Sequence, residues 1–270
     1  MGGRMKLKYS IAHGWTTNDA AGEDRGRQFG DGLFETIRLN GRGEAPLWAL
    51  HLRRLARGLK ALRFSDSAVA TVFSALDSLS HPQMSTACKL IVTRGVTERG
   101  YAFSDDLEPV ITITYFDAAA LISKPMSAGL SDVALSGQRA LAGHKHLNRL
   151  EQVLARAAFE KEWDEAIMLS QTGLVVEGCM TNVFVKLDDE WHTPELNECG
   201  IDGVVRQWLL SQNTKIQVRA VSLEELRHAE AAVVTNSLIG VRSMGQFEGK
   251  LLDISPESRE WQTAYQELFI

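Results

Sequence analysis

Short apolar runs and helical repeats alternate along the N-terminal part of the chain. Residues 34–39, 88–93 and 110–116 are rich in β-branched and aromatic side chains, which predicts strands. Residues 46–62 and 67–79 place an apolar side chain at every third or fourth position, which predicts amphipathic helices. This mixture predicts a unit that combines a sheet with helices, of the α/β (α+β) class.

The C-terminal part carries a second set of strand and helix signals. Four apolar runs predict a second sheet: residues 166–170, 174–176, 182–187 and 231–234. Ser255 followed by Pro256 predicts the start of a last helix. Residues 117–124 show neither pattern and precede Pro125, which disfavours a helix just before it. We therefore expect the following division: a small α/β domain over 1–116, a linker over 117–124 and a larger domain over 125–270.

One further stretch, residues 143–152, opens another apolar repeat. We expect a helix to begin just after Lys145 and to bury a stripe on one face. The stripe consists of Leu147, Leu150, Val153, Leu154 and Ala157. Lys145 would then lie in the turn before the helix, where its side chain can point into a cleft. The alternative is an ordinary solvated lysine, because charged residues are mostly exposed.

Composition and charge narrow the classes of function. The chain has 270 residues, 44% hydrophobic and 23% charged, and a formal net charge of −5. These values are typical of a globular protein and offer no electrostatic attraction to nucleic acid. No uncharged run reaches the roughly 18 residues of a membrane span, and no apolar leader follows the N-terminus. We expect a cytoplasmic protein with a small-molecule substrate.

The cysteines argue against two other kinds of site. Cys88, Cys179 and Cys199 are odd in number and lack the spacing of metal ligands. A disulfide framework and a zinc site are therefore not expected, and no metal is predicted.

Three polar features invite a chemical interpretation, each with a plain alternative. Glu177 lies within an apolar strand, where a carboxylate needs a partner unless it faces water. Gly203 precedes a predicted helix whose first amides, those of Val204 and Val205, suit a phosphate, although glycine is common at turns. Arg54 belongs to the basic face of a predicted helix, where most side chains are solvated.

Several segments, in order between residues 24 and 244, resemble the motifs of the fold-type IV, pyridoxal-phosphate-dependent enzymes, the class IV aminotransferase family. They are Phe29-Gly30-Asp31-Gly32 after Asp24-Arg25, His51-Leu52-Arg53-Arg54-Leu55, Lys145-His146-Leu147-Asn148-Arg149-Leu150-Glu151-Gln152, Glu177 with Asn182-Val183-Phe184, and Gly203-Val204-Val205-Arg206. The lysine segment and the loop Arg94-Gly95 to Arg99-Gly100-Tyr101 are similar to those of the aminodeoxychorismate lyases within this family.

The resemblance implies a fold and a set of cofactor ligands. The fold is a small α/β domain joined to a larger domain with a β-barrel-like core, in a homodimer. Lys145 would bind pyridoxal 5'-phosphate covalently, and Glu177 would face its ring nitrogen. The phosphate would be held by Arg54, by the amides of Val204 and Val205, and by the turn Thr235-Asn236-Ser237, of which Asn236 is our candidate.

The resemblance also implies an activity. A lyase of this family converts 4-amino-4-deoxychorismate to 4-aminobenzoate and pyruvate, a step of folate biosynthesis that is coupled to aminodeoxychorismate synthase. Lys145 would be the general base, and Arg94 and Arg99 would bind substrate carboxylates. Thr36 would either protonate the departing enolpyruvate or be an ordinary strand residue. Two alternatives stay open: a D-amino-acid or branched-chain aminotransferase of the same fold, and a binding module without catalysis.

Overall fold

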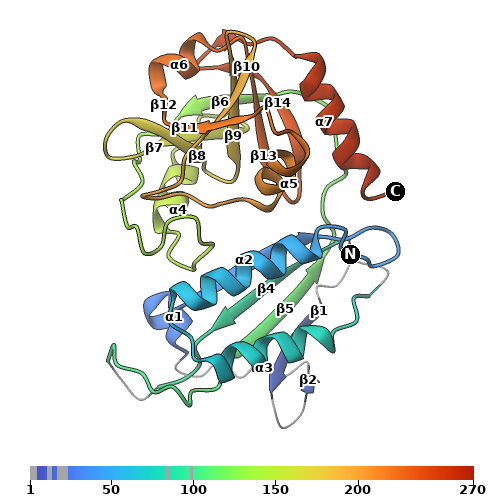
Figure 1. The fold of residues 1–270 in the computed structure, drawn as a ribbon, viewed down its shortest axis with the longest axis vertical. Helices are drawn as coiled ribbons and strands as arrows, with labels where there is room; N and C mark the ends of the chain where they lie inside the picture. The colour runs from blue at the N-terminus through green and yellow to red at the C-terminus, as the bar shows by residue number, and fades with distance from the viewer. Residues whose placement is uncertain (1–4, 11–13, 17–23, 83–85, 98–99) are drawn as a thin grey trace. The chain divides into compact units, whose positions relative to one another are not determined.

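The computed structural model describes residues 5–10, 14–16, 24–82, 86–97 and 100–270 (Figure 1). Contacts between Cα atoms divide the chain into two compact units. The first comprises Met1–Ala119, His144–Asn148 and Phe269–Ile270. The second comprises Ala120–Gly143 and Arg149–Leu268. The segment that carries Lys145 therefore groups with the N-terminal unit, although it lies just past the midpoint of the sequence, between two parts of the second unit.

The first unit is built on a five-stranded antiparallel sheet with the order β2-β1-β5-β4-β3. Its strands are β1 (Met5–Ser10), β2 (Gly14–Thr16), β3 (Gly32–Arg38), β4 (Ala87–Thr93) and β5 (Val110–Phe116). The three strands predicted from β-branched runs are thus confirmed within two residues. β3 is at an edge of the sheet, so its second side is open to pairing with another segment.

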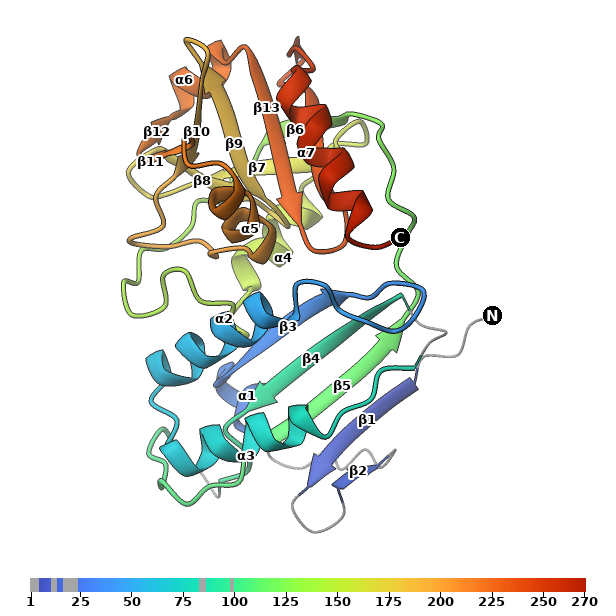
Figure 2. The same cartoon turned by 45° about the vertical axis from the view of Figure 1, so that its right-hand side comes forward.

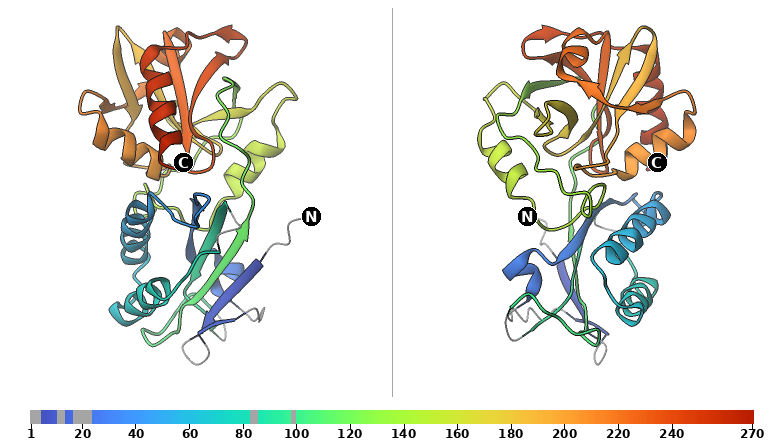
Figure 3. Two further views of the ribbon diagram at one scale, coloured as in Figure 1. Left: turned by 90° about the vertical axis from the view of Figure 1, so that its right-hand side faces the viewer. Right: turned by 60° about the vertical axis from the view of Figure 1, so that its left-hand side comes forward.

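Two helices, α2 (Trp48–Ala61) and α3 (Asp66–Asp77), cover one face of this sheet (Figures 2 and 3). The short helix α1 (Arg25–Phe29) precedes β3 and does not lie with them on that face (Figure 3). Leu33 and Leu90 of the sheet pack against Leu59 of α2 and Val72 of α3 in one buried cluster. Burial of such side chains stabilises each by about 1.5–3 kcal/mol, so the apolar faces predicted from the sequence hold the helices on the sheet.

The second unit contains a ten-stranded sheet with the order β11-β10-β9-β13-β14-β6-β7-β8-β12, and β15 pairs with β14. Its strands are β6 (Met126–Leu130), β7 (Glu165–Leu169), β8 (Leu174–Gly178), β9 (Asn182–Leu187), β10 (Glu190–Pro194), β11 (Gln217–Arg219), β12 (Val221–Ser222), β13 (Ala231–Asn236), β14 (Gly240–Phe247) and β15 (Lys250–Leu251). The sheet curves on itself, because β10 near one edge also approaches β8 and β12 at the other. This curvature agrees with the expected barrel-like core.

Four helices belong to this unit: α4 (Leu150–Ala157), α5 (Val204–Gln212), α6 (Leu223–His228) and α7 (Pro256–Glu267). Ser222 and Glu225 form a complete capping box at α6. Ser255 caps α7 and Pro256 occupies its first turn, as predicted. α7 lies along β14 (Figure 1).

The prediction for the helix after Lys145 was wrong in two respects. α4 begins at Leu150, five positions after the lysine, and the expected apolar stripe is not buried. Leu150, Val153 and Leu154 are 69%, 60% and 52% exposed, whereas Ala155 is buried. The spacing of apolar residues identified the helix. It did not predict that the opposite face, which carries Ala155, is the one that packs against the core of the unit.

Two further observations concern membrane spans and disulfide bonds, neither of which the sequence predicts. Among the described residues, no helix is long and apolar enough to cross a membrane. Cys88, Cys179 and Cys199 are all free thiols, so no disulfide joins them.

Candidate functional site

A buried ion-pair cluster joins β3 to α2 in the first unit. Glu35 lies on the same strand face as Leu33 and Ile37, and it is only 2% exposed. Its carboxylate accepts a hydrogen bond from Arg54 Nε at 2.8 Å and a second, short one from Arg54 Nη2. His51 Nδ1 lies 2.7 Å from the same carboxylate. The predicted motif residue Arg54 is thus buried, whereas its neighbours Arg53 and Arg57 are solvated.

Burial and the neighbouring charges shift the pKa values of Glu35 and His51. Burial alone would raise the pKa of Glu35, but the guanidinium of Arg54 and the hydrogen bond from His51 lower that pKa to about 2. Burial lowers the pKa of His51, and the charges of Arg54 and Lys145 add to that shift, against the opposing effect of Glu35. His51 is therefore neutral near pH 7, and Lys145 is close enough for its charge to act on the imidazole.

The segment that carries Lys145 lies along the open edge of β3. Phe34 N donates to Lys145 O at 3.0 Å, and Leu147 N donates to Gly32 O at 3.0 Å. His146 forms an antiparallel bridge with Leu33 between these two bonds. Lys145 precedes α4 and is half-buried, with Nζ 4.2 Å from the centroid of the Phe34 ring. A half-buried amine beside an aromatic face is held more rigidly than a lysine in solvent.

Thr36 is on β3 as well, on the face opposite Glu35. It is half-buried and pairs in register with Lys89 of β4, whose ammonium lies 5.1 Å from the Phe34 ring centroid. Thr36 and Phe34 therefore share one face of the strand. Its role as a proton donor stays a prediction.

Arg94 occupies a different environment from the one its loop suggested. It is 5% exposed, and its guanidinium donates to Asp31 through Nε at 2.8 Å and Nη2 at 3.1 Å. It also donates to the carbonyl oxygens of Leu62 and Arg63. A substrate carboxylate would have to replace one of these partners, so the role of Arg94 as a carboxylate ligand stays a prediction. Arg99 lies outside the described residues.

Asp31 is shared between two arginines, Arg94 and Arg25. Asp31 also accepts a hydrogen bond from Arg25 Nε at 2.8 Å. Burial raises the pKa of Asp31, but the hydrogen bonds from Arg94 and Arg25 outweigh it and lower the pKa below its ordinary value. The Arg94 guanidinium is sandwiched between the Phe64 and Phe103 rings, 4.3 Å and 3.7 Å from their centroids. Arg94 therefore has a structural role in the first unit, where it contacts Asp31 and two aromatic rings.

The second unit places Glu177 near the end of β8. The residue is 3% exposed, and its Oε2 accepts a hydrogen bond from Ile201 N at 2.8 Å. The neighbouring Asn182, first residue of β9, donates through Nδ2 to Ile201 O at 2.8 Å and accepts from Gly203 N at 3.1 Å. Glu177 and Asn182 thus hold the loop that leads into α5. The buried-carboxylate interpretation of Glu177 is correct, and the edge-strand alternative is not.

The N-terminus of α5 is formed by the predicted residues. Gly203 is the N-cap, and Val204 and Val205 follow as the first helical residues, each 1% exposed. A Cβ atom on Gly203 would lie 2.0 Å from Asn182 Oδ1, so a larger residue here would displace the Asn182 side chain. The first amides of a helix lack intrahelical acceptors, and together with the helix dipole they suit an anion.

At the end of β13, the structure distinguishes two of the three turn residues between which the sequence could not choose, Thr235 and Asn236. Asn236 Oδ1 accepts from Leu238 N and Ile239 N, each at 2.9 Å, so this side chain caps a turn. Thr235 is 1% exposed and pairs in register with Asn182, and its buried Oγ1 has no hydrogen-bond partner in the part of the chain that the structure describes. A buried hydroxyl without a partner costs about 1–3 kcal/mol, so Thr235 fits a ligand-binding role better than Asn236.

Arg206 lies in the first turn of α5. It is 7% exposed and donates to Asp202 at 2.9 Å and to Pro194 O at 3.0 Å. Its Nε is buried without a partner among the described residues. Burial lowers the pKa of Arg206, and the carboxylates of Asp202 and Glu177 oppose this shift. Sequence reasoning assigned no role to Glu35, and it named His51 and Arg206 only as members of motifs. It named Thr235 as one of three turn residues but chose Asn236 as the candidate.

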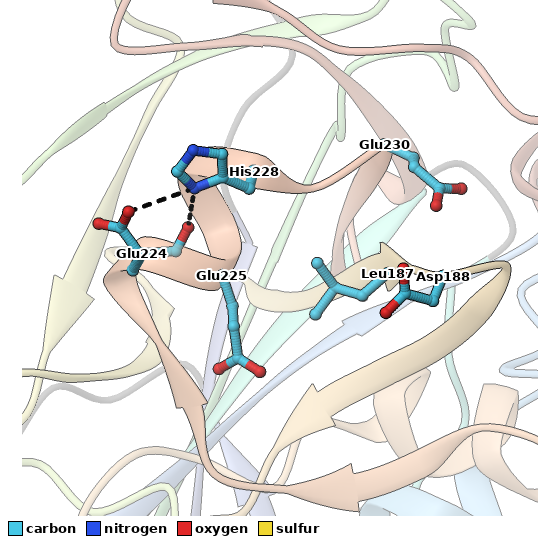
Figure 4. Close-up of a pocket in the computed structure, with 6 residues that line it drawn as sticks. All are labelled: Leu187, Asp188, Glu224, Glu225, His228 and Glu230. Carbon is cyan, nitrogen blue, oxygen red and sulfur yellow. Dashed lines mark hydrogen bonds and ion pairs between the residues drawn. The ribbon is translucent and has the colours of Figure 1, made fainter.

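A pocket of about 270 Å³ lies elsewhere in the second unit, between the end of β9 and α6 (Figure 4). It is lined by Leu187, Asp188, Glu224, Glu225, His228 and Glu230. His228 Nδ1 already lies 2.9 Å from Glu224 O. Among the described residues no group of three His, Cys, Asp or Glu side chains could hold a metal ion, so this acidic pocket is not a metal centre.

Comparison with known proteins gives a consistent result. The amino-transferase class IV family profile matches residues 32–247. The aminodeoxychorismate lyase of Vibrio harveyi is 34% identical over 227 residues, covering 81% of this chain and 83% of that enzyme. The D-alanine aminotransferase of Bacillus licheniformis is 28% identical over 263 residues, covering 90% of this chain and 89% of that enzyme.

A solved structure agrees with the sequence comparison. The crystal structure of 4-amino-4-deoxychorismate lyase from Pseudomonas aeruginosa superposes with a TM-score of 0.84 at 30% identity, over 97% of this chain and 98% of that one. Because the family profile spans most of the chain and the two-sheet fold is shared, the protein belongs to the class IV aminotransferase family.

Proposed function

We propose that this protein is a pyridoxal-phosphate-dependent lyase that converts 4-amino-4-deoxychorismate to 4-aminobenzoate and pyruvate. The observation that carries the proposal is the 34% identity to the Vibrio harveyi lyase across most of both chains. The 30% identity to the Pseudomonas aeruginosa lyase over almost the whole fold supports it.

The donor set of the second unit fits a phosphorylated cofactor. The first amides of α5 suit a phosphate, and the buried Thr235 hydroxyl has no partner among the described residues. We propose that Val204, Val205 and Thr235 bind the phosphate, and that Asn236 acts by shaping the turn beside them. Arg54 is a further phosphate ligand in this proposal, because it matches the arginine of the His51-Leu52-Arg53-Arg54-Leu55 motif and a guanidinium can bind a phosphate through two parallel hydrogen bonds.

The cofactor's ring is assigned to two other residues. We propose that Lys145 binds its aldehyde carbon and that Glu177 faces the ring nitrogen. When bound, pyridoxal phosphate supplies an electron sink for a carbanion next to the substrate nitrogen. The buried Glu177 carboxylate holds a proton at the ring nitrogen, and the amide of Ile201 fixes the direction of that carboxylate.

Lys145 also moves the proton of the reaction. A lysine amine has a reference pKa of about 10.4, so this role requires burial and a cationic neighbour to favour the neutral, basic form of the amine. Arg54 lies in the same cluster as His51, whose titration responds to Lys145. The amine removes the proton from the substrate carbon that bears nitrogen. Thr36 is our candidate for returning a proton to the departing enolpyruvate, and Arg99 for a substrate carboxylate.

A second candidate function is D-amino-acid transamination, which the 28% identity to the Bacillus licheniformis D-alanine aminotransferase favours. It would use the same lysine and acidic residue but would need a 2-oxo acid in every cycle. In the lyase the nitrogen leaves with the aromatic product, so no amino acceptor is consumed.

Turnover without an oxo acid separates the two functions. The purified protein should release pyruvate and 4-aminobenzoate in many equivalents per site from aminodeoxychorismate alone. If release stopped after one equivalent and resumed on adding 2-oxoglutarate, the aminotransferase would be the correct assignment. D-Alanine and L-leucine with 2-oxoglutarate serve as the matched comparison.

We further propose a homodimer, supplied with substrate by an aminodeoxychorismate synthase. Leu150, Val153 and Leu154 of α4 are each more than half exposed, and such a cluster of large apolar side chains is typical of an interface. Substituting Leu150 and Val153 with lysine should lower the mass measured by light scattering; a wild-type monomer would refute the proposal.

A further inference from the structure

The turn between β8 and β9 is wrapped around a buried carboxylate, that of Glu165. Residues 178–181 form this turn and separate Glu177 from Asn182. Glu165, the first residue of β7, is 0% exposed. Its Oε1 accepts from Ala166 N at 2.9 Å. Its Oε2 accepts from Met180 N at 3.2 Å and from Thr181 Oγ1 at 2.9 Å.

The carboxylate fills the inside of the turn. A Cβ atom on Gly178 would lie 2.2 Å from Thr181 Oγ1 and 2.9 Å from Glu165 Cδ, so the strand end fits closely around both groups. Gly178 N also donates to Thr181 O at 2.7 Å, and Cys179 N donates to Ala166 O at 2.9 Å. Any displacement of Thr181 therefore moves the residue on each side of the turn.

Glu165 makes no ion pair within the described residues, so its carboxyl group is held by hydrogen bonds alone. Burial raises the pKa of Glu165, and the bonds from Ala166, Thr181 and Met180 oppose that shift. A buried carboxylate without a cation is costly, and an apolar side chain would fill the same volume at lower cost. Both oxygens must accept, which glutamine cannot reproduce, because its NH2 group would face a backbone N–H in either orientation.

We propose that Glu165 is a positioning residue that acts through Thr181 to set the directions of Glu177 and Asn182. The proposal rests on the function assigned above to Glu177. Glu165 does not touch the reacting atoms. It fixes the turn so that one neighbour presents its carboxylate and the other holds the loop before α5.

Matched variants at Thr181 test this assignment. Thr181→Val keeps the volume and removes the hydroxyl, so kcat should fall about 10-fold with KM within about twofold of wild type. Thr181→Ser retains the hydroxyl and should keep kcat within about twofold. Glu165→Gln should lower kcat by about 10- to 100-fold. In hydrogen–deuterium exchange of the cofactor-free protein, the amides of 178–182 should exchange faster in Thr181→Val and Glu165→Gln only.

The outcomes separate this inference from the function on which it rests. If Glu165→Gln does not fold, the Thr181 pair decides. Equal kcat in Thr181→Val and Thr181→Ser, or unchanged exchange of the turn, would overturn the positioning role. Glu177→Gln is measured alongside: wild-type kcat in that variant would remove the role of Glu177 itself, whereas the exchange data would still report what holds the turn.

Discussion

Two buried arginines, one in each unit, meet their hydrogen-bonding needs in opposite ways. Arg54 is 4% exposed, and Glu35 engages its guanidinium through two hydrogen bonds. Arg206 is 7% exposed, and although Asp202 and Pro194 take two of its N–H groups, its Nε has no partner in the described part of the chain. Thr235, in the same unit as Arg206, leaves its hydroxyl equally unsatisfied.

The difference separates a pre-organised region from a region that needs a ligand. Glu35, His51 and Arg54 stabilise one another, so their geometry exists before any ligand binds. The α5 region contains buried donors that gain partners only from something that binds there, and each such gain is worth about 1–3 kcal/mol. Removing the cofactor should therefore loosen the second unit more than the first.

The largest expected effect tests the first region. Lys145→Ala should lower turnover by more than about 10³-fold, because the variant would lose both of the roles proposed for Lys145, covalent attachment of the cofactor and general base. Lys89→Ala is the matched control, since its ammonium also lies beside the Phe34 ring. Borohydride reduction followed by peptide mass analysis should place the cofactor on Lys145. A reduced adduct at Lys89, or wild-type turnover in Lys145→Ala, would overturn the assignment.

The next effect concerns the stability of the same region and its dependence on pH. The pKa of Glu35 is about 2 in the fold, against 4.5 for the ordinary group. A lowered carboxyl pKa stabilises the fold above pH 4.5, and that stabilisation is lost as the pH falls toward 2. The contribution is about 3 kcal/mol, since one pKa unit is worth about 1.4 kcal/mol.

Urea unfolding at pH 7 and pH 3 measures this contribution. Glu35→Gln should be less stable than wild type at pH 7, because Arg54 is left as an uncompensated buried charge. Its free energy of unfolding should also change less between the two pH values. The double variant Glu35→Gln, Arg54→Met is the control and should recover part of the loss. Equal pH dependence in wild type and Glu35→Gln would show that the ion pair does not carry the effect.

The smallest effect tests the second region. Thr235→Val should weaken pyridoxal phosphate binding by about 10-fold, which corresponds to about 1.4 kcal/mol, whereas Thr235→Ser should retain it. Thr193→Val is the control: Thr193 is also fully buried, but its hydroxyl already donates to Val183 O at 2.9 Å. Spectroscopic titration of the cofactor-free proteins measures the affinities. If Thr193→Val and Thr235→Val lost affinity equally, general destabilisation would explain both.

The sequence predicted regular elements well where one physical signal dominates. The β-branched runs that became β4, β5 and β9 were recognised within one residue, because burial on a sheet selects those side chains. The stripe on α4 failed as a burial prediction, since periodicity reports an apolar face and not what covers it. Lys145 and Glu177 were found as motif residues, and both roles stay proposals.

The rest of the site depends on contacts between distant segments. Glu35 shares a strand face with Leu33 and Ile37, so period-two alternation marks it as buried, but only the fold identifies Arg54 and His51 as its partners. Thr235 could not be separated from Asn236 by sequence, because both are common strand-end residues. Their difference lies in which atoms find hydrogen bonds after folding.

The pairing of residues 144–148 with the edge of β3 also has a consequence for biosynthesis. During translation, the N-terminal sheet emerges from the ribosome long before Lys145 does, and until then the backbone groups of Gly32 and Phe34 lack the partners that this segment provides. An uncovered edge strand invites pairing with other chains. During this interval the edge of β3 in the nascent polypeptide is exposed to chaperones and to aggregation. The exposure ends when the segment that carries Lys145 pairs with β3.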